Sequence, residues 1–154
     1  MKVGITFGSF DLFHSGHVSM LEEAKTVCDY LIVGLQTDPT IDRPEKKNKP
    51  IQNIVERQIQ LRGCKYVDEL ILYNTEPELL DILDTVKWDI RIIGEEYKGK
   101  YPHFTGGDRC NVAAGTLYFN KRKHNFSSTN LRKRIIDLHK ETEKYEVIET
   151  LAPF

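Results

Sequence analysis

Cysteine is scarce in this sequence, and its spacing excludes two kinds of small domain. The 154 residues contain only Cys28, Cys64 and Cys110, an odd number with no C-x-x-C pair among them. Such spacing argues against both a disulfide framework and a zinc site. Reduced thiols in a cytoplasmic protein are therefore expected.

Long apolar runs and an excess of one charge are missing as well. No apolar run approaches the roughly 18 residues of a membrane-spanning helix, and the first residues lack the basic region and apolar stretch of a secretory signal. The 22 Lys and Arg residues balance 23 Asp and Glu residues, for a formal net charge of -1. We therefore expect no membrane and no nucleic-acid partner.

What remains is a spacing of apolar residues that predicts an α/β domain. Strands are expected at 3–7, 30–34, 69–73, 89–94 and 115–120, and helices at 16–28, 52–62, 76–87 and 129–140. This alternation predicts one parallel sheet with helices on both faces. A single domain is expected over 1–141. In the C-terminal tail, 142–154, we expect Tyr145, Val147 and Leu151 to pack on the domain or on a partner subunit.

Two apolar patterns predict which faces of these elements are buried. The first strand alternates its apolar residues at Val3, Ile5 and Phe7. That alternation predicts a strand with one buried face. The apolar residues of 52–62 are Ile54, Val55, Ile59 and Leu61. Glu56 and Arg57 are therefore expected on the more polar side of that helix.

Two polar segments are expected to be loops. In 38–50, Pro44 and Pro50 break helices, and three lysines, Lys46, Lys47 and Lys49, lie close together. These lysines form either a solvated surface or a ligand-facing cluster, because the loop leaves the carboxyl end of a strand, where parallel sheets bind ligands. The glycine-rich segment 95–115 is expected to cross the sheet edge as an irregular loop.

The clearest chemistry lies between the first strand and the first helix, in the stretch GSFDLFHSGH at 8–17. Gly8 allows a tight turn or a close approach to a ligand, and Gly16 starts the helix without a side chain. The unpaired N–H groups of such a helix start form an anion site. His14 and His17 bracket Gly16, so two imidazoles face a bound anion as donors and potentially as cations. A single histidine at a helix start is usually a cap, but two histidines around a glycine favour a functional role.

A second anion site is expected where the last strand meets the last helix. A basic cluster, KRKH at 121–124, is followed by Ser127, Ser128 and Thr129. Helix capping explains one of these hydroxyl residues. Three in a row after a basic cluster favour a second phosphate cradle.

These stretches resemble those of a known family. GSFDLFHSGH resembles the H-x-G-H signature of a nucleotidyltransferase superfamily, and KYVDELI, IIGEEYKGK and RKHNFSSTNLRKRI are similar, in order, to segments of its cytidylyltransferases. The match runs across most of residues 1–135 and is greatest for the small glycerol-3-phosphate cytidylyltransferases. It implies a Rossmann-like fold, a homodimer, and transfer of CMP from CTP to a phosphorylated alcohol, with Mg²⁺ held mainly by the triphosphate and water.

The resemblance also implies roles for individual residues. The catalytic positions are His14, His17, Lys46 and Arg122, although Lys47 and Lys49 compete with Lys46. The nucleotide-binding positions are Gly8, Ser9, Phe10, Asp11, Gly16, Arg57, Lys65, Gly94, Glu96, Ser127, Ser128 and Thr129. No cluster of metal ligands is expected, because Mg²⁺ keeps mostly nucleotide and water oxygens. Asp11 is the one carboxylate expected near that metal.

Two alternatives stay open. The stretch FSSTNLR is similar to the I-S-S-T-x-I-R of nicotinamide-mononucleotide adenylyltransferases. An adenylyltransferase of that type, or of the pantetheine-phosphate type, would use ATP, although KYVDELI and IIGEEYKGK are the wider match and favour CTP. A non-catalytic nucleotide-binding module is the other alternative. It has no physical need for two intact anion cradles, which argues against it.

Overall fold

Strand β1 (Val3–Gly8) runs through the middle of a parallel sheet in the computed structural model, which describes residues 1–143. Across the sheet the order is β3 (Glu69–Tyr73), β2 (Tyr30–Gln36), β1, β4 (Ile90–Gly94) and β5 (Leu117–Asn120). Every neighbouring pair is parallel. The predicted α/β fold with a parallel sheet is confirmed, and each strand lies within two residues of its expected bounds.

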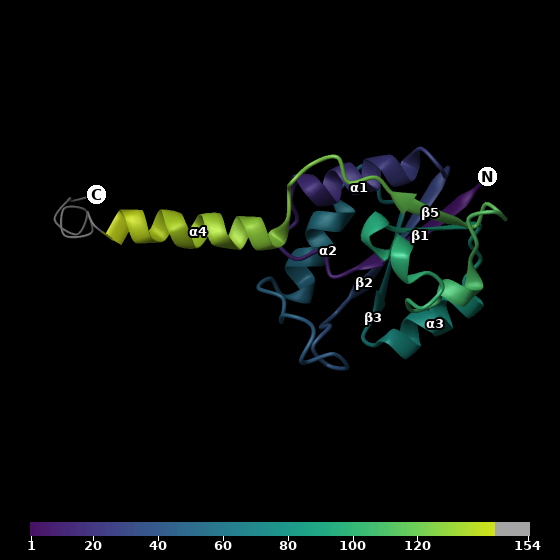
Figure 1. Ribbon diagram of the computed structural model, residues 1–154, viewed down its shortest axis with the longest axis horizontal. Coiled ribbons are helices and arrows are strands. Elements are labelled where there is room, and N and C mark those ends of the chain that lie inside the picture. The colour runs from purple at the N-terminus through teal and green to yellow at the C-terminus, as the bar shows by residue number, and fades with distance from the viewer. Residues whose placement is uncertain (144–154) are drawn as a thin grey trace.

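Helices cover both faces of this sheet. The elements are α1 (Ser15–Lys25), α2 (Ile54–Arg62), α3 (Glu76–Thr85), α4 (Ser128–Glu143) and the short helices η1 (Glu95–Lys100) and η2 (Gly107–Arg109). Leu21 of α1 and Leu61 of α2 pack in one core cluster, whereas Leu79 and Leu83 of α3 pack in another with Ile5. Figure 1 shows α4 projecting away from the sheet. No helix in the described part of the chain is long and apolar enough to cross a membrane.

The helices on the sheet begin where side chains cap them. Asn53 accepts a hydrogen bond from the Glu56 N–H at 2.9 Å, and Thr75 accepts one from the Glu78 N–H at 3.4 Å. Each cap satisfies an N–H group that has no partner within its own helix. Pro77 lies in the first turn of α3, and Gly63 ends α2, both as the sequence predicts.

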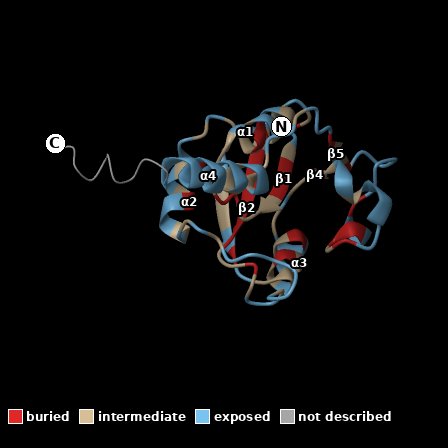
Figure 2. Ribbon diagram, turned by 60° about the vertical axis from the view of Figure 1, so that its left-hand side comes forward, coloured by how far each residue is buried: buried red, intermediate tan, exposed pale blue. Residues whose placement is uncertain are grey.

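Strand β1 is buried on both faces, so the prediction of one buried face was wrong. Gly4, Ile5 and Thr6 are all buried, although they alternate in direction along the strand. The central position of β1 explains the difference, because α1 covers one face and α3 the other. Figure 2 shows the buried residues concentrated on β1 and β2, and α4 largely exposed.

The predicted faces of α2 were also wrong. Arg57 is 1% exposed, whereas Val55 and Ile59 are 58% and 66% exposed. The guanidinium turns inward because backbone carbonyls at the ends of two strands accept its hydrogen bonds, as detailed below. The hydrogen bonds that Arg57 makes inside the protein therefore stabilise it more than burying Val55 and Ile59 would.

Segment 95–115 is more ordered than the predicted loop. It contains η1 and η2, and its Phe104 and Cys110 pack against Leu117 of β5 in a third core cluster. The expected packing of the tail at Tyr145, Val147 and Leu151 lies outside the described residues. Helix α4 continues to Glu143, past the expected domain boundary at 141, and the division into 1–141 and 142–154 stays a prediction.

Candidate active site

The turn that follows β1 has an unusual backbone conformation. Phe10 and Leu12 have φ angles of 48° and 52°, in the left-handed region that costs a residue with a side chain roughly 1–2 kcal/mol. Two contacts hold the turn. The Gln52 Oε1 accepts a hydrogen bond from the Leu12 N–H at 2.9 Å, and Arg57 donates to the Ser9 carbonyl at 3.0 Å. Strained turns that the surroundings fix in this way are concentrated at functional sites.

This turn delivers the two histidines to the start of α1. His14 caps the helix, because its Nδ1 accepts a hydrogen bond from the Gly16 N–H at 3.0 Å. The His17 Nδ1 accepts from the His14 N–H at 3.3 Å, and the two rings stack with centroids 3.8 Å apart. The histidines therefore form a fixed pair beside the helix N-terminus, as the spacing H-x-G-H predicts.

Gly16 allows this close packing. A Cβ at this position would lie 2.8 Å from the His14 ring and 3.0 Å from the Phe126 carbonyl oxygen. Any larger residue would push the 121–128 segment away from α1. The glycine thus brings the two predicted anion cradles together.

Ser128 joins the two cradles directly. Its hydroxyl donates to the Asp11 carbonyl at 3.3 Å and lies 3.2 Å from the His14 Nε2. Since its one proton goes to Asp11, the hydroxyl accepts from His14, which places the imidazole proton on Nε2. By the same reasoning, the His17 proton lies on Nε2, because its Nδ1 is an acceptor.

Both imidazoles are neutral near pH 7. Burial, followed by the neighbouring His14, lowers the pKa of His17 to about 3, although Asp11 raises it in part. Burial also lowers the pKa of His14, and His124 and Arg122 lower it further. The histidines therefore act as N–H donors, and the positive charge of the site comes from elsewhere.

A cavity of about 650 Å³, here called the histidine cavity, opens beside this pair. Its lining includes His14, Gly16, His17, Gly94, Glu96, Asn120, Arg122, Ser127 and Ser128. Lys121 and Lys123 also line it and add positive charge. Arg122 donates to the Phe126 carbonyl at 2.9 Å, so its guanidinium is held against the loop that enters α4. Glu22 and Glu23 line it as well, so an elongated polyanion fits only the part of the wall formed by the histidines, Arg122 and the two helix starts.

Asp11 stabilises the protein rather than facing this cavity. It is 7% exposed, and its carboxylate accepts from the Ile51 and Gln52 N–H groups at 2.9 Å and from Arg132 at 3.0 Å. Burial alone would raise the pKa of Asp11, but these donors lower it overall. The carboxylate therefore ties the turn to two distant segments.

Several predicted residues lie apart from the histidine cavity. Arg57 donates to the carbonyls of Ser9, Gln36, Thr37 and Gln52 and holds the strand ends in place. Lys65 precedes β3 and is exposed at the amino end of the sheet, next to Tyr66. Lys46 and Thr129 are exposed and line neither cavity described here. Ser127, by contrast, lines the histidine cavity and also caps α4 by accepting a hydrogen bond from the Asn130 N–H at 3.0 Å.

A second cavity of about 320 Å³, here called the arginine cavity, adjoins the first and shares Gly94, Glu96 and Asn120 with it. Its lining also includes Gly8, Ser9, Arg43, Lys47, Glu76 and Arg91. Phe10 lines neither cavity and is buried in the core instead. Lys47, rather than Lys46, is thus the loop lysine at a cavity wall.

The sequence left the choice among Lys46, Lys47 and Lys49 open, and it gave no role to Asn120 or Arg91. The Asn120 Oδ1 is buried at the rim of both cavities and has no hydrogen-bond partner. An arginine inside a strand that is otherwise apolar, as in DIRIIG, was the one signal available for Arg91. Such a side chain interrupts a pattern that should be continuous in a parallel strand.

Residues 1–143 contain no group of three or more His, Cys, Asp or Glu side chains that could hold an ion. Asp11, the carboxylate nearest in sequence to the histidines, already accepts hydrogen bonds from three donors. The residues present therefore do not form a protein cage for Mg²⁺.

Known proteins resemble this chain over most of its length. A family model described as cytidylyltransferase-like matches residues 5–134. Glycerol-3-phosphate cytidylyltransferase of Bacillus subtilis (strain 168) is 34% identical over 139 residues, which cover 90% of this chain and 100% of that protein. Bifunctional protein HldE of Caulobacter sp. (strain K31) is 35% identical over 131 residues, or 85% of this chain, but the chain spans only 26% of that relative.

A solved structure supports the fold. The lipopolysaccharide core biosynthesis protein from Thermoplasma volcanium GSS1 superposes with a TM-score of 0.54 at 24% sequence identity. The match covers 90% of this chain and 89% of that one. This likeness shows that the sheet and its helices have the Rossmann-like arrangement.

Proposed function

The chain belongs to the cytidylyltransferase-like family, and we propose that it transfers CMP from CTP to a phosphorylated alcohol such as glycerol 3-phosphate. An oxygen of the acceptor phosphate attacks the α-phosphorus of CTP. The bond from that phosphorus to the bridging oxygen breaks, and its electrons leave with pyrophosphate. The products are a CDP-alcohol and pyrophosphate, and catalysis consists mainly of positioning and charge stabilisation.

The hydrogen bond between His14 and Ser128 is the observation that carries this proposal. It joins the N-terminus of α1 to the N-terminus of α4, so two anion-binding helix starts face one cavity. One helix start suits a single phosphate, whereas two suit a chain of phosphates. A triphosphate is the ligand that this arrangement favours.

The neutral histidines are suited to the transition state. His17 presents its Nε2–H beside the N-terminus of α1, where we propose that it binds the α-phosphate. Negative charge grows on the equatorial oxygens as the acceptor attacks, and a fixed N–H donor stabilises that charge without losing its own proton. Arg122 and the free N–H groups at the start of α4 would bind the β- and γ-phosphates from the other side of the histidine cavity, while the Ser128 hydroxyl holds His14 in place. No general base is required, because a phosphate monoester is already a nucleophile near neutral pH.

The metal and the second subunit remain proposals. We propose that Mg²⁺ enters on the triphosphate and neutralises its charge, with water completing the coordination, and no step of the reaction is assigned to it here. A homodimer is expected from the family resemblance. The exposed side chains of Ile135, Ile136 and Leu138 on α4 favour such an association, because apolar residues gathered on one helix often mark an interface.

A pyrophosphate-release assay tests the proposed function. The purified chain is incubated with Mg²⁺, each common nucleoside triphosphate in turn, and a panel of phosphorylated alcohols. Release with CTP and an acceptor, but not with CTP alone, is the expected result. Release only with ATP would favour the adenylyltransferase alternative, which the FSSTNLR stretch keeps open. No release with any pair would favour a non-catalytic module.

A further inference from the structure

Arg91 is a charged side chain buried in the wall of the arginine cavity. Only 4% of it is exposed, and it is the second residue of β4. It is paired in register with Ile5 of β1, so both side chains lie on the α3 face of the sheet. The histidines start α1, which covers the opposite face.

No carboxylate forms an ion pair with Arg91 anywhere in residues 1–143. One guanidinium nitrogen donates to the Thr105 carbonyl, and the Nε is buried without a partner. Burial lowers the pKa of this guanidinium, which nevertheless stays protonated in a protein. Glu76 raises the pKa of Arg91 in part, but this carboxylate is itself paired with Arg43. A buried cation without an ion-pair partner is costly, so an anion is the missing partner.

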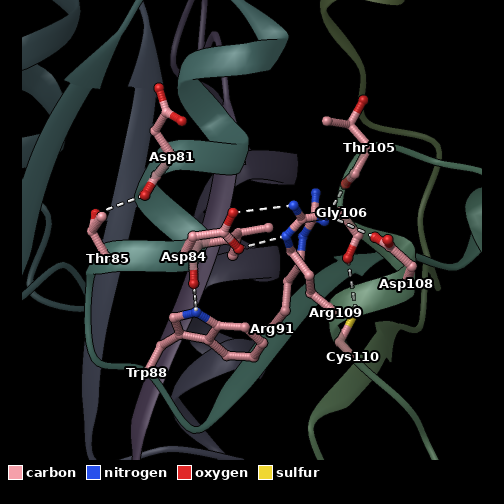
Figure 3. Close-up of polar contacts among 11 residues, drawn as sticks. Asp81, Asp84, Thr85, Trp88, Arg91, Thr105, Gly106, Asp108, Arg109 and Cys110 are labelled. Carbon is pink, nitrogen blue, oxygen red and sulfur yellow. Dashed lines mark hydrogen bonds and ion pairs between the residues drawn. The ribbon is translucent and has the colours of Figure 1, made fainter.

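The surroundings of Arg91 hold the guanidinium in position. Its Cζ lies 5.2 Å from the Phe7 ring centroid and 5.3 Å from that of Phe104. A Cβ on Gly106 would come within 2.8 Å of the Arg91 Nη1, so only glycine leaves room for the group. Figure 3 shows Arg91 between α3 and the segment from Thr105 to Cys110, with Arg109 beside it. Asp84 pairs with Arg109 and not with Arg91.

The other charges of the arginine cavity leave it with a positive excess. Arg43 forms an ion pair with Glu76 at 2.5 Å, so these two largely cancel. Lys47 and Arg91 then face a single further carboxylate, Glu96, at the rim shared with the histidine cavity. An anionic group is favoured inside, at the end remote from that rim.

The two cavities adjoin, as the transfer of CMP from a nucleotide to an acceptor requires. A nucleotide in the histidine cavity and an acceptor in the arginine cavity meet at the shared rim near Gly94. The acceptor phosphate must lie at that rim to reach the α-phosphorus. The rest of the acceptor then extends past Phe7 toward Arg91.

We propose that Arg91 selects acceptors that carry a second anionic group, a carboxylate or a second phosphate, at the end remote from the reacting phosphate. This inference rests on the proposed function and narrows its substrate class. Lys47 assists from the loop, and the Phe7 and Phe104 rings hold the guanidinium in position. An acceptor with a positive far end is excluded by the same charge.

Acceptors that differ only at the far end test the proposal. We suggest phosphoethanolamine, glycerol 3-phosphate, 3-phosphoglycerate and glycerol 1,3-bisphosphate, which end in a cation, a neutral group, a carboxylate and a phosphate. The ratio of kcat/KM for an anionic acceptor to that for glycerol 3-phosphate should be roughly 10–100, the usual effect of a charged hydrogen bond. The better of the two anionic acceptors identifies the anion. A ratio of one or less, with rapid turnover of glycerol 3-phosphate, would overturn this inference and leave the proposed function intact.

Variants of Arg91 distinguish a loss of acceptor selectivity from a general loss of activity. Arg91→Gln should bring the ratio close to one, and Arg91→Lys should keep part of it. Arg109→Gln is the matched control, because this neighbouring arginine lines neither cavity, and it should leave the ratio unchanged. If Arg91→Gln does not fold, Lys47→Gln on the loop should still lower the ratio, and an unchanged ratio would contradict the proposal.

Binding without turnover separates this inference from the proposed function. Lack of pyrophosphate release with every pair would defeat the proposed function only. In that case the melting temperature of the wild-type chain is compared in 3-phosphoglycerate, glycerol 1,3-bisphosphate and glycerol 3-phosphate. A larger increase with either anionic acceptor, lost in Arg91→Gln but kept in Arg109→Gln, would support the anionic pocket. Equal increases would overturn it.

Discussion

His14 and Ser128 lie 114 residues apart in the sequence, yet the His14 Nε2 and the Ser128 Oγ are 3.2 Å apart. The contact fixes the imidazole tautomer and joins the starts of α1 and α4 in one wall. Neither residue alone would define a triphosphate site. Their contact fixes the position of the start of α1 relative to the start of α4.

Ser128→Ala should lower kcat by about tenfold. The change removes the Ser128 hydrogen bonds to His14 and to the Asp11 carbonyl, each worth roughly 0.5–1.5 kcal/mol, and leaves His14 free to rotate away from the phosphates. Steady-state pyrophosphate release measures the effect. Thr85→Ala is a matched control, because it removes an exposed hydroxyl that donates to the Asp81 carbonyl on α3. Equal rates in Ser128→Ala and wild type would show that the contact is not needed for catalysis.

His17→Ala should reduce kcat by roughly 10²–10³-fold, the usual cost of removing a well-placed donor to a developing charge. The fold should survive, since α1 keeps its His14 cap and its buried Leu21. Circular dichroism and single-turnover kinetics check the two statements. The same substitution at the exposed His103 should have no effect on the rate. Near-normal activity of His17→Ala would remove this residue from the proposed mechanism.

His17 also makes stability depend on pH. Its pKa is about 3 in the folded chain and near 6.5 when unfolded, so only the unfolded state takes up a proton between these values. The contribution of neutral His17 to the free energy of unfolding is therefore fully present above pH 6.5. It is lost as the pH falls, by at most about 1.4 kcal/mol per pH unit. Urea unfolding between pH 7 and pH 5 should show a weaker loss in His17→Asn than in wild type. Parallel curves would contradict the low pKa.

Arg57→Met should destabilise the chain by about 3 kcal/mol, because it leaves buried carbonyls of Ser9 and Gln36 without donors. Urea unfolding measures this loss. Arg62→Met, at an exposed arginine near the end of the same helix, should cost much less. An unchanged stability together with a raised KM for CTP would instead favour the nucleotide-binding role that the family resemblance implies for Arg57.

Patterns local in the sequence predicted the fold well. The short apolar run at Tyr30 to Gly34 and the helix bounded by Pro77 depend on neighbours in the chain, and both elements formed within two residues of the expected bounds. The pair His14 and His17 was also local, because one helical turn sets their spacing. Those parts of the account follow from periodicity and capping.

Contacts between distant segments could not be predicted in the same way. The burial of Arg57 depends on carbonyls at the ends of β1 and β2, and the position of Arg91 depends on Gly106. Periodicity assigns Arg57 to the polar side of its helix and gives Arg91 no role, since it contains no information about which carbonyl or ring lies opposite. A polar residue inside an apolar strand, as at Arg91, is the local sign that such a partner exists.

A competition experiment among the four nucleotides shows whether the chain uses CTP. The chain is supplied with Mg²⁺, one phosphorylated alcohol and equal concentrations of ATP, CTP, GTP and UTP, and the products are identified by mass spectrometry. The account predicts a CDP-alcohol as the main product, formed together with an equal amount of pyrophosphate and absent with His17→Ala. An ADP-linked product, or no nucleotide-linked product from any acceptor, would contradict it.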